Sequence, residues 1–278
     1  MIVTAKIEEV RAVRKQDKDE NWGFVPTMGY LHEGHLSLVR RAREENGRVA
    51  VSIYVNPTQF APTEDLASYP RDLERDLALL EAENVDLVFT PSDEMMYPPD
   101  FQTAVLLSHV TKPLEGAARP THFAGVATVV AKLFNIVQPD RAYFGQKDAQ
   151  QTVVLRQMVR DLNFNLELIV CPIVREPDGL AMSSRNKYLN PDERKAALVL
   201  SRALQWARIA FEEGERDANT LRRIMTDLII AEPLARLAYV SAAHPETLVE
   251  LERIEDKALL SMAVFIGKTR LIDNLIIA

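Results

Sequence analysis

The sequence predicts an α/β fold, a Rossmann-like doubly wound parallel sheet followed by a smaller C-terminal α+β lid domain. Two observations lead to this prediction. Over the first part of the chain, short apolar runs alternate with helical patterns, as in βαβ units whose strands are parallel and buried on both faces. Beyond residues 174–179, which include Pro177 and Gly179, helical patterns are followed by strand-like runs only. We therefore predict domains over residues 1–174 and 175–278.

The elements of the first predicted domain alternate along the chain. Ile7, Val10 and Val13 are three residues apart, so they lie on one face of a first helix. Later helices are predicted from similar spacing, and each strand is predicted from a short apolar run between turn residues. The predicted helices cover residues 5–18, 36–45, 72–83, 126–137 and 149–161. The predicted strands cover residues 22–26, 48–55, 85–90, 142–144 and 166–173.

In the second predicted domain the first helix has a clear start. Asn190 is a favourable N-cap residue, and Pro191 suits the first helical position. Two helices and a small antiparallel sheet indicate an α+β domain, which we expect to act as a lid. The predicted helices cover residues 191–213 and 217–230, and the predicted strands cover residues 235–242, 258–266 and 271–277.

The composition excludes several classes of protein. Of 278 residues, 47% are hydrophobic and 26% are charged, which is typical of a globular protein and not of a disordered one. The formal net charge of −7 argues against nucleic-acid binding, which usually needs a basic face. No apolar stretch approaches the ~20 residues of a membrane-spanning helix, and we expect a cytoplasmic protein. The single cysteine, Cys171, fits a buried strand better than a catalytic nucleophile.

Two histidines stand where the first long strand is predicted to end. Residues 27–35, Thr-Met-Gly-Tyr-Leu-His-Glu-Gly-His, follow Pro26 and lead into a helix. Ligands of open α/β sheets bind at the carboxyl ends of strands, and helix N-termini attract phosphate. His32 and His35 can face the same side of the first helical turn and donate hydrogen bonds to a phosphate. Their spacing of three disfavours zinc, because the helical zinc-protease motif needs a spacing of four, and surface histidines are the other alternative.

Two further polar clusters favour a nucleotide site. Residues 144–148, Phe-Gly-Gln-Lys-Asp, follow another predicted strand. There Lys147 can bind phosphate and Asp148 can bind ribose hydroxyls, although a solvated turn explains these residues equally well. Residues 183–185, Ser-Ser-Arg, suit a mobile loop that closes over a triphosphate. The three clusters together predict nucleotide binding.

Neutral amides offer a place for a second substrate. Asn56 and Gln59 follow the predicted strand over residues 48–55, and Gln151 begins the helix after Lys147. Amides suit a hydroxylated acid better than another full charge does, while a surface role is the alternative for each of them.

Seven short stretches resemble the pantothenate synthetase family, in the same order from end to end of the chain. They are residues 26–35, 51–60, 69–71, 114–126, 144–151, 179–189 and 270–274. The resemblance implies a nucleotidyltransferase-superfamily ligase that condenses pantoate with β-alanine in pantothenate biosynthesis, the route to coenzyme A. ATP would activate pantoate as an adenylate with release of pyrophosphate, and β-alanine would then displace AMP. Position 75 departs from the family pattern, since this chain has Arg75 where other members sometimes have a second acidic residue.

The resemblance also implies roles for individual residues, with His35 as the proton donor beside the catalytic residues His32 and Lys147. Gln59 and Gln151, joined by Asn56, would bind pantoate and β-alanine. Magnesium would bridge the phosphates, with Asp76 as a contact through water, and the enzyme would be a homodimer. The implied ATP-binding residues are Met28, Gly29, Tyr30, Leu31, His32, Glu33, Gly34, His35, Gly145, Gln146, Lys147, Asp148, Val174, Met182, Ser183, Ser184 and Arg185.

Other functions remain open at the level of sequence. Another adenylate-forming transferase of the same superfamily would exchange pyrophosphate with a different acid. A non-catalytic nucleotide-binding module would fail a single-turnover assay. A fragment of a tRNA synthetase is disfavoured by the acidic charge and by the absence of an anticodon-binding domain.

Overall fold

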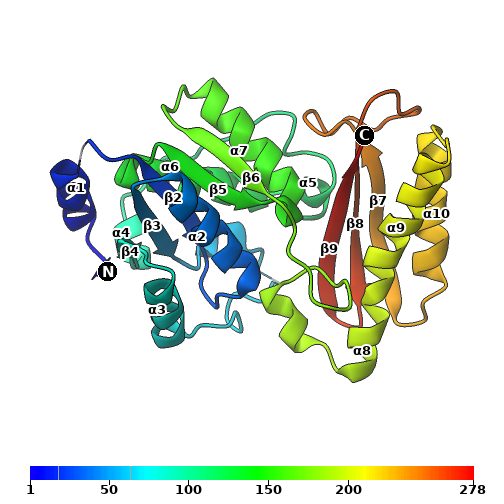
Figure 1. Ribbon diagram of the computed structural model, residues 1–278, viewed down its shortest axis with the longest axis horizontal. Coiled ribbons are helices and arrows are strands. Elements are labelled where there is room, and N and C mark those ends of the chain that lie inside the picture. The colour runs from blue at the N-terminus through cyan, green and yellow to red at the C-terminus, as the bar shows by residue number, and fades with distance from the viewer. Residues whose placement is uncertain (18, 63) are drawn as a thin grey trace. The chain divides into compact units, whose positions relative to one another are not determined.

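The structure, a computed structural model, describes residues 1–17, 19–62 and 64–278. It divides into two compact units. Figure 1 draws their helices and strands, coloured by residue number. The first unit comprises Met1–Gly145 and Val154–Pro172, and the second comprises Gln146–Val153 and Ile173–Ala278. The chain therefore passes from one unit to the other after residues 145, 153 and 172, whereas we predicted a single boundary after residue 174.

A parallel sheet forms the centre of the first unit and confirms the predicted fold class. Within the described residues it has six strands in the order β1-β4-β3-β2-β5-β6, and every neighbouring pair is parallel. We predicted five of them and missed β1, an edge strand of three residues. The strands are β1 (Ile2–Thr4), β2 (Trp22–Thr27), β3 (Arg48–Ile53), β4 (Leu87–Phe89), β5 (Arg141–Gly145) and β6 (Glu167–Cys171).

The strand order reverses between β2 and β5. From β2 the chain continues through β3 to β4 on one side, whereas from β5 it continues to β6 on the other side. In open α/β sheets a ligand binds outside the carboxyl ends of the strands at such a switch point. The loop that follows Thr27, at the end of β2, therefore starts at the position where the fold favours a ligand.

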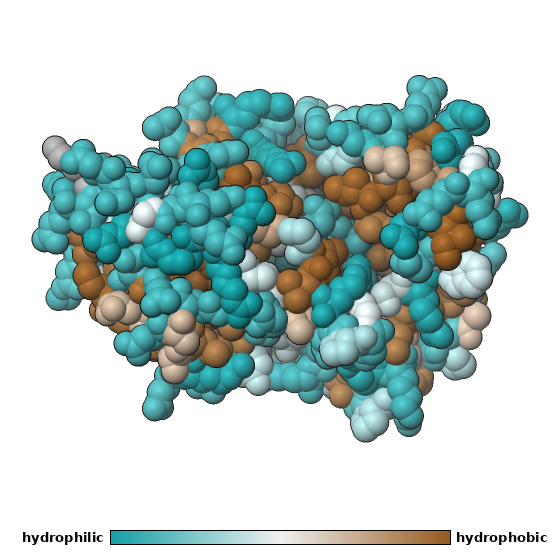
Figure 2. Space-filling view, viewed as in Figure 1, coloured by the Kyte–Doolittle hydropathy of each residue, from teal (hydrophilic) through white to brown (hydrophobic). Residues whose placement is uncertain are grey.

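Helices cover both faces of this sheet. Helix α2 packs against β2, β3 and β5, and α6 packs against β2 and α1. Figure 2 shows that the outer face of α2 is mainly hydrophilic, and its buried side includes Leu36 and Val39. The helix predicted over residues 5–18 is α1, and residue 18 lies outside the described residues. The helices are α1 (Ile7–Gln16), α2 (Glu33–Glu45), α3 (Leu73–Ala82), α4 (Asp93–Met96), α5 (Glu115–Ala118), α6 (His122–Val137) and α7 (Ala149–Asp161).

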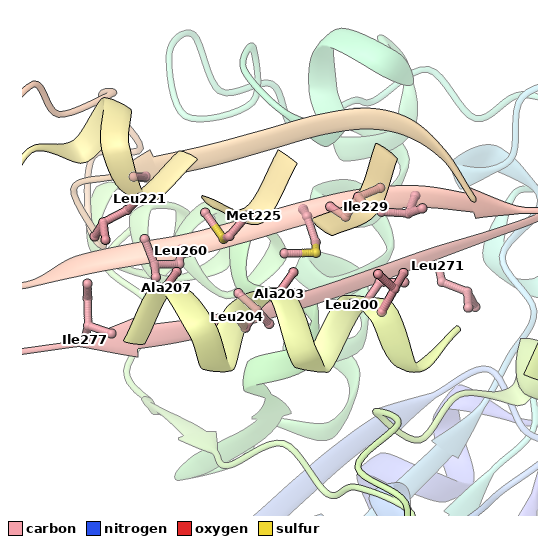
Figure 3. Packing of buried hydrophobic residues seen from close by; sticks show 14 of the residues in the cluster. Leu200, Ala203, Leu204, Ala207, Leu221, Met225, Ile229, Leu260, Leu271 and Ile277 are labelled. Atoms are coloured by element: carbon pink, nitrogen blue, oxygen red, sulfur yellow. The ribbon is translucent and has the colours of Figure 1, made fainter. Parts of the chain in front are cut away.

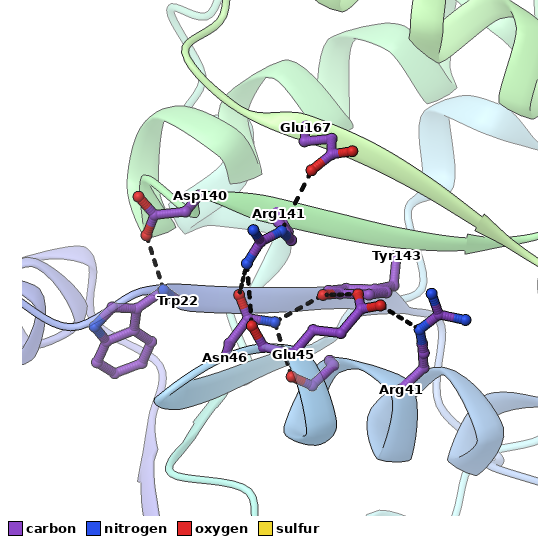
Figure 4. A network of polar contacts seen from close by, with 9 residues as sticks. Trp22, Arg41, Glu45, Asn46, Asp140, Arg141, Tyr143 and Glu167 are labelled. Atoms are coloured by element: carbon purple, nitrogen blue, oxygen red, sulfur yellow. Dashed lines mark hydrogen bonds and ion pairs between the residues drawn. The ribbon is translucent and has the colours of Figure 1, made fainter.

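A polar network joins the strands at their amino-terminal ends (Figure 4). The side chain of Asn46 donates to the hydroxyl of Tyr143 at 2.7 Å, and that hydroxyl donates to Glu45 at 2.8 Å. Arg141, the first residue of β5, donates to the carbonyl of Glu45 at 3.0 Å and pairs with Glu167 at 3.3 Å. Because ligands bind at the carboxyl ends, we interpret this network as structural. Cys171 is buried at the end of β6, as predicted.

The second unit packs two long helices on one face of an antiparallel sheet with the order β7-β8-β9. Leu200, Leu204 and Ala207 of α9 and Met225 of α10 point into this core, which Figure 3 shows from close by. Asn190 caps α8 as predicted, and Ala197 separates α8 from α9. The elements are α8 (Pro191–Ala196), α9 (Leu198–Glu212), α10 (Ala218–Ile230), β7 (Ala235–Ala243), β8 (Ala258–Ile266) and β9 (Thr269–Ile277). No helix of the described chain is long and apolar enough to cross a membrane.

Candidate active site

A glycine shapes the loop that follows β2. Gly29 has a φ of +78°, and a Cβ atom there would lie 2.9 Å from Cγ2 of Ile53 and 3.1 Å from Oδ2 of Asp76. Residues with side chains rarely adopt this φ, and the space is already occupied, so the position requires glycine. Tyr30 follows with a φ of 51°. Two left-handed residues in succession thus turn the chain from β2 towards α2.

Asp76 of α3 holds the peptide groups that come after this turn. Its side chain is 1% exposed. The carboxylate accepts hydrogen bonds from the backbone N of Tyr30 at 2.6 Å and of Leu31 at 2.7 Å. Burial raises the pKa of Asp76, and the two N–H donors oppose that rise. The neighbouring Arg75 donates to the carbonyl of Leu31 at 2.9 Å. One turn of α3 therefore fixes the loop that leads to the histidines.

The two predicted histidines lie side by side where α2 begins. The N-cap residue is His32, and its backbone N–H donates to Nδ1 of His35 at 3.3 Å. The ring centroids are 4.1 Å apart. Because Nδ1 of His35 accepts a hydrogen bond, the neutral ring carries its proton on Nε2 and can donate it to a ligand. Donors at a helix N-terminus are well placed to bind a phosphate.

Gln59 brings the segment after β3 to the same loop. It lies in η1 (Pro57–Gln59), and its Nε2 donates to Sδ of Met28 at 2.9 Å. Its Oε1 accepts from Nδ2 of Asn56 at 3.2 Å. Asn56 is 1% exposed, and its side chain also donates to the carbonyl of Gly125 and accepts from the hydroxyl of Tyr97. The structure thus brings together three predicted site residues, of which Asn56 is held within the protein by its own hydrogen bonds.

Two residues to which we assigned no role hold the backbone of Gln59. Its carbonyl oxygen lies 2.9 Å from Nδ1 of His122 and 3.3 Å from Nη2 of Arg119. Nη1 of Arg119 lies 3.2 Å from Nε2 of His122, and Nη2 is 2.8 Å from Oε2 of Glu64. A guanidinium only donates and a carbonyl only accepts, so His122 is neutral with its proton on Nδ1. Burial, reinforced by Arg119, lowers the pKa of His122 to about 4. The sequence could have pointed to both residues, since they lie in the stretch 114–126 that resembles the family.

The second unit contains the other predicted phosphate-binding residues. The turn η2 (Gln146–Asp148) follows β5, and Nζ of its half-buried Lys147 lies 3.7 Å from Oδ1 of Asp148. The backbone carbonyls of this turn accept hydrogen bonds from Asn274, which belongs to another of the quoted stretches and had no predicted role. Gln151, the predicted substrate amide of this unit, is half-buried on the first turn of α7.

The predicted Ser-Ser-Arg segment forms a short helix of its own. It opens η3 (Ser184–Tyr188), which Ser183 caps by accepting a hydrogen bond from the backbone N of Arg185 at 3.3 Å. A backbone hydrogen bond of 3.0 Å from Met182 to Val174 closes the turn that precedes it. The structure therefore places Val174, Met182 and the Ser-Ser-Arg residues in one compact segment of the second unit.

The residues that the structure describes do not form a metal cage. The described chain contains no group of three or more histidine, cysteine, aspartate or glutamate side chains that could hold a metal ion. Both oxygens of Asp76, the predicted magnesium contact, already accept backbone hydrogen bonds. Magnesium often binds through substrate phosphates, water and one or two carboxylates. The donors present fit an ion carried by a nucleotide and leave the contact of Asp76 through water as a prediction.

Several known proteins that are similar to this chain belong to one family. The family model described as pantoate-beta-alanine ligase matches residues 2–276. A pantothenate synthetase of Roseiflexus castenholzii is 64% identical over 277 residues, which cover 100% of this chain and 99% of that protein. A pantothenate synthetase of Chloroflexus aurantiacus is 66% identical over 253 residues, which cover 91% of this chain and 90% of that protein.

Solved structures show the same similarity. The crystal structure of pantothenate synthetase from Thermus thermophilus has a TM-score of 0.95 and 50% identity, and the match covers 99% of both chains. A pantoate-beta-alanine ligase from Francisella tularensis, complexed with "Beta-gamma ATP" and β-alanine, has a TM-score of 0.82 and 36% identity. That match covers 99% of this chain and 97% of the other. The similarity therefore extends over both units of the fold.

Proposed function

The chain belongs to the pantoate–β-alanine ligase family, and we propose that it joins pantoate to β-alanine at the expense of ATP through a pantoyl adenylate. It is a ligase that forms a carbon–nitrogen bond. The junction of β2 and α2 carries the adenylate proposal, because His32 and His35 begin a helix at the switch point of the sheet. Gln59, which lies against Met28, supplies a neutral amide beside those donors.

In the first step of the proposed reaction, a carboxylate oxygen of pantoate attacks the α-phosphorus of ATP. A new P–O bond forms, the bond to the β-phosphate oxygen breaks, and pyrophosphate leaves. Negative charge builds on the phosphate oxygens, and Nε2–H of His35 with the neighbouring His32 would donate hydrogen bonds to them. Lys147 and the Ser183–Arg185 segment would bind the remaining phosphates. Magnesium, when bound, would neutralise phosphate charge.

In the second step the amine of β-alanine attacks the acyl carbon of the adenylate. A C–N bond forms, the bond from the acyl carbon to the phosphate oxygen breaks, and AMP leaves while the amine loses a proton. No side-chain nucleophile is needed, and the one cysteine, Cys171, is buried with its pKa raised by burial. The protein's contribution would be to align the two substrates, with Gln59 and Gln151 as ligands of the pantoate hydroxyls or carboxylate.

The proposal has three further parts. Homodimer formation rests on the family resemblance, whereas a cytoplasmic location and a lid role for the domain after residue 174 rest on the sequence patterns. The grouping of residues 146–153 with the second unit adds Lys147 to the residues that would move with such a lid.

Isotope exchange tests the adenylate. Labelled pyrophosphate should enter ATP when magnesium and pantoate are present and β-alanine is absent, because activation needs only the nucleotide and the acid. Omitting pantoate should stop the exchange, and adding β-alanine should divert the intermediate to pantothenate and AMP. If exchange requires β-alanine, or if the γ-phosphate is released as free phosphate, the adenylate mechanism is wrong. If another small acid replaces pantoate with equal efficiency, the substrate assignment is wrong.

A further inference from the structure

Strand β9 contains an asparagine to which the proposed reaction gives no part. Asn274 is 3% exposed. Its Nδ2 donates to the carbonyl oxygen of Gln146 at 3.0 Å and to that of Lys147 at 2.9 Å. Its Oδ1 accepts from Nε2 of Gln146 at 2.9 Å. An asparagine side chain has two N–H donors and one carbonyl acceptor, so all of its groups are engaged by the turn η2.

The preceding residue holds a different segment of the same unit. Asp273 is 1% exposed and pairs with both terminal nitrogens of Arg175, at 2.7 Å and 2.9 Å. Nη1 of Arg175 also donates to the carbonyl of Gly179 at 3.1 Å. Successive side chains of a strand point to opposite faces of the sheet. Adjacent residues of β9 therefore hold, on opposite faces, the turn that bears Lys147 and the turn that precedes Ser183.

We propose that Asn274 is a positioning residue that acts through Lys147. The two carbonyls that it binds belong to the peptide groups on either side of the Lys147 Cα atom. Fixing both peptide planes fixes the backbone dihedrals of Lys147 and with them the direction of its Cα–Cβ bond. The lysine side chain is flexible beyond its Cβ atom. The fold can therefore set the direction of this side chain only through the backbone of Lys147. This inference rests on the proposed phosphate-binding role of Lys147.

Positioning of Lys147 matters because the stabilisation that a charged group gives to a reacting phosphate depends on the distance between them. A displacement of about 1 Å at a reacting centre can reduce a rate by up to about 100-fold. Without the Asn274 side chain, the carbonyls of Gln146 and Lys147 would lose this donor, and η2 would lose these two hydrogen bonds to β9. We expect Asn274→Ala to slow pyrophosphate exchange by roughly 10- to 100-fold, mainly through kcat, because ATP keeps its other contacts.

A double-mutant cycle distinguishes positioning from a general loss of structure. Pyrophosphate exchange is measured for the natural protein, Asn274→Ala, Lys147→Ala and the double variant. If Asn274 acts through Lys147, Asn274→Ala should reduce the exchange rate by less than about 3-fold when Lys147 has already been replaced by alanine. An equal cost in both backgrounds would overturn the proposal. Asn274→Leu, which keeps nearly the same volume, removes both donors and adds no charge, repeats the cycle if the alanine variant does not fold.

Asn46→Ala is the matched control. Asn46 is also buried, and its Nδ2 donates to the carbonyl of Ala42 and to the hydroxyl of Tyr143, at the amino-terminal end of the sheet. This variant should lower the melting temperature as Asn274→Ala does and leave the exchange rate within about 2-fold. An equal loss of exchange in both variants would show that instability explains the effect. Absence of exchange in the natural protein would refute the proposed function, whereas an additive cycle with normal exchange would refute only this inference.

Discussion

At the scale of single residues, the side chains near the proposed site act mainly on peptide groups. Asp76 binds two backbone N–H groups of the β2–α2 loop, and His122 and Arg119 bind the carbonyl of Gln59. Each contact fixes a segment that bears a predicted ligand-binding residue. A loop with fixed peptide groups loses less conformational entropy when a ligand binds, which favours preorganisation.

The role of His35 can be tested by truncation. His35→Ala should lower the rate of pyrophosphate exchange by at least about 100-fold, because one donor to a developing oxyanion is worth roughly 3 kcal/mol. Exchange at saturating ATP and pantoate is the measurement. His109→Ala, at an exposed position outside the site, is the control and should exchange at the normal rate. Near-normal turnover of the His35 variant would remove this residue from the catalytic group.

Asp76 can be assigned to the loop or to the metal by substitution with asparagine. An amide at this position puts an NH₂ group opposite one of the two backbone donors, so at least one buried hydrogen bond is lost, at a cost of about 1–3 kcal/mol. We expect Asp76→Asn to lower activity by a similar factor at every magnesium concentration. A magnesium titration of activity is the measurement. Recovery of the variant at high magnesium would instead show that the carboxylate serves the ion.

His122 should make stability depend on pH in a defined window. Its folded-state pKa of about 4 lies below its ordinary value of 6.5. Between these values the unfolded chain binds a proton that the folded chain does not, so stability is full above pH 6.5 and falls as the pH drops towards 4. The loss is roughly 3 kcal/mol. His122→Asn keeps a donor for the carbonyl of Gln59 but does not titrate.

Urea unfolding at several pH values measures this effect as the difference between the natural protein and His122→Asn. Any advantage of the natural protein should shrink as the pH falls from 6.5 to 4, because the common titration of carboxylates cancels in the difference. A difference that stays constant over this range would contradict the neutral, buried state of His122.

At the scale of elements, α6 supports η1 through an unusually close approach. A Cβ atom at Gly125 of α6 would lie 2.5 Å from the carbonyl oxygen of Thr58 and 2.7 Å from the backbone N of Gln59. These are backbone atoms, so Gly125→Ala must displace η1 and with it Gln59. We expect KM for pantoate to rise about 10-fold, with ATP affinity, measured by calorimetry, changed far less.

The control for this substitution separates displacement from instability. Gly214 has a φ of +109° and open space around it, so Gly214→Ala should destabilise the second unit through backbone strain alone. It should lower the melting temperature without raising KM for pantoate. Equal KM changes in the two variants would show that loss of stability, and not movement of Gln59, is responsible.

The elements that the sequence predicted well are those with a clear local signal. A short apolar run marked β2, a β-branched run marked β3, and Asn190 with Pro191 marked the start of α8. Strand β1 was missed because it has only three residues, of which Ile2 and Val3 are exposed at the edge of the sheet. Helix α6 begins at His122, four residues before the predicted start, because the pattern around Gly125 is atypical of a helix.

The site was predictable as a set of loops but not as a set of contacts. Strand ends followed by glycine, histidine and lysine indicated where a phosphate binds, and the structure places those residues at strand ends or on the turns that follow. The partners of these loops could not be inferred, since Asp76 is 46 residues from Tyr30 and Asn274 is 127 residues from Lys147. Such pairs depend on tertiary packing, which local patterns do not encode.

At the scale of the whole molecule, the predicted ATP-binding residues are divided between two units. The β2–α2 loop belongs to the first unit, and Gln146–Asp148 and Ser183–Arg185 belong to the second. Within the second unit, Asn274 binds the turn at residues 146–148, and Asp273 binds Arg175 of the turn that precedes Ser183. Both segments are therefore held by strand β9. If the two segments held by β9 both bind ATP, they should respond to it together and not one by one.

Hydrogen exchange tests this joint response. A non-hydrolysable ATP analogue with magnesium should slow amide exchange in residues 146–150 and in residues 182–188 over the same range of analogue concentration, because each segment would acquire phosphate contacts. Helix α10, which packs in the core of the second unit, should exchange at an unchanged rate and serves as the internal reference.

In Asn274→Ala the protection of residues 146–150 should weaken, while residues 182–188, held through Arg175 and Asp273, should keep theirs. Unchanged exchange in residues 182–188 of the natural protein would rule out the Ser-Ser-Arg segment as a part of the ATP site, and protection that also spreads into α10 would indicate a general stabilisation of the unit in place of specific contacts.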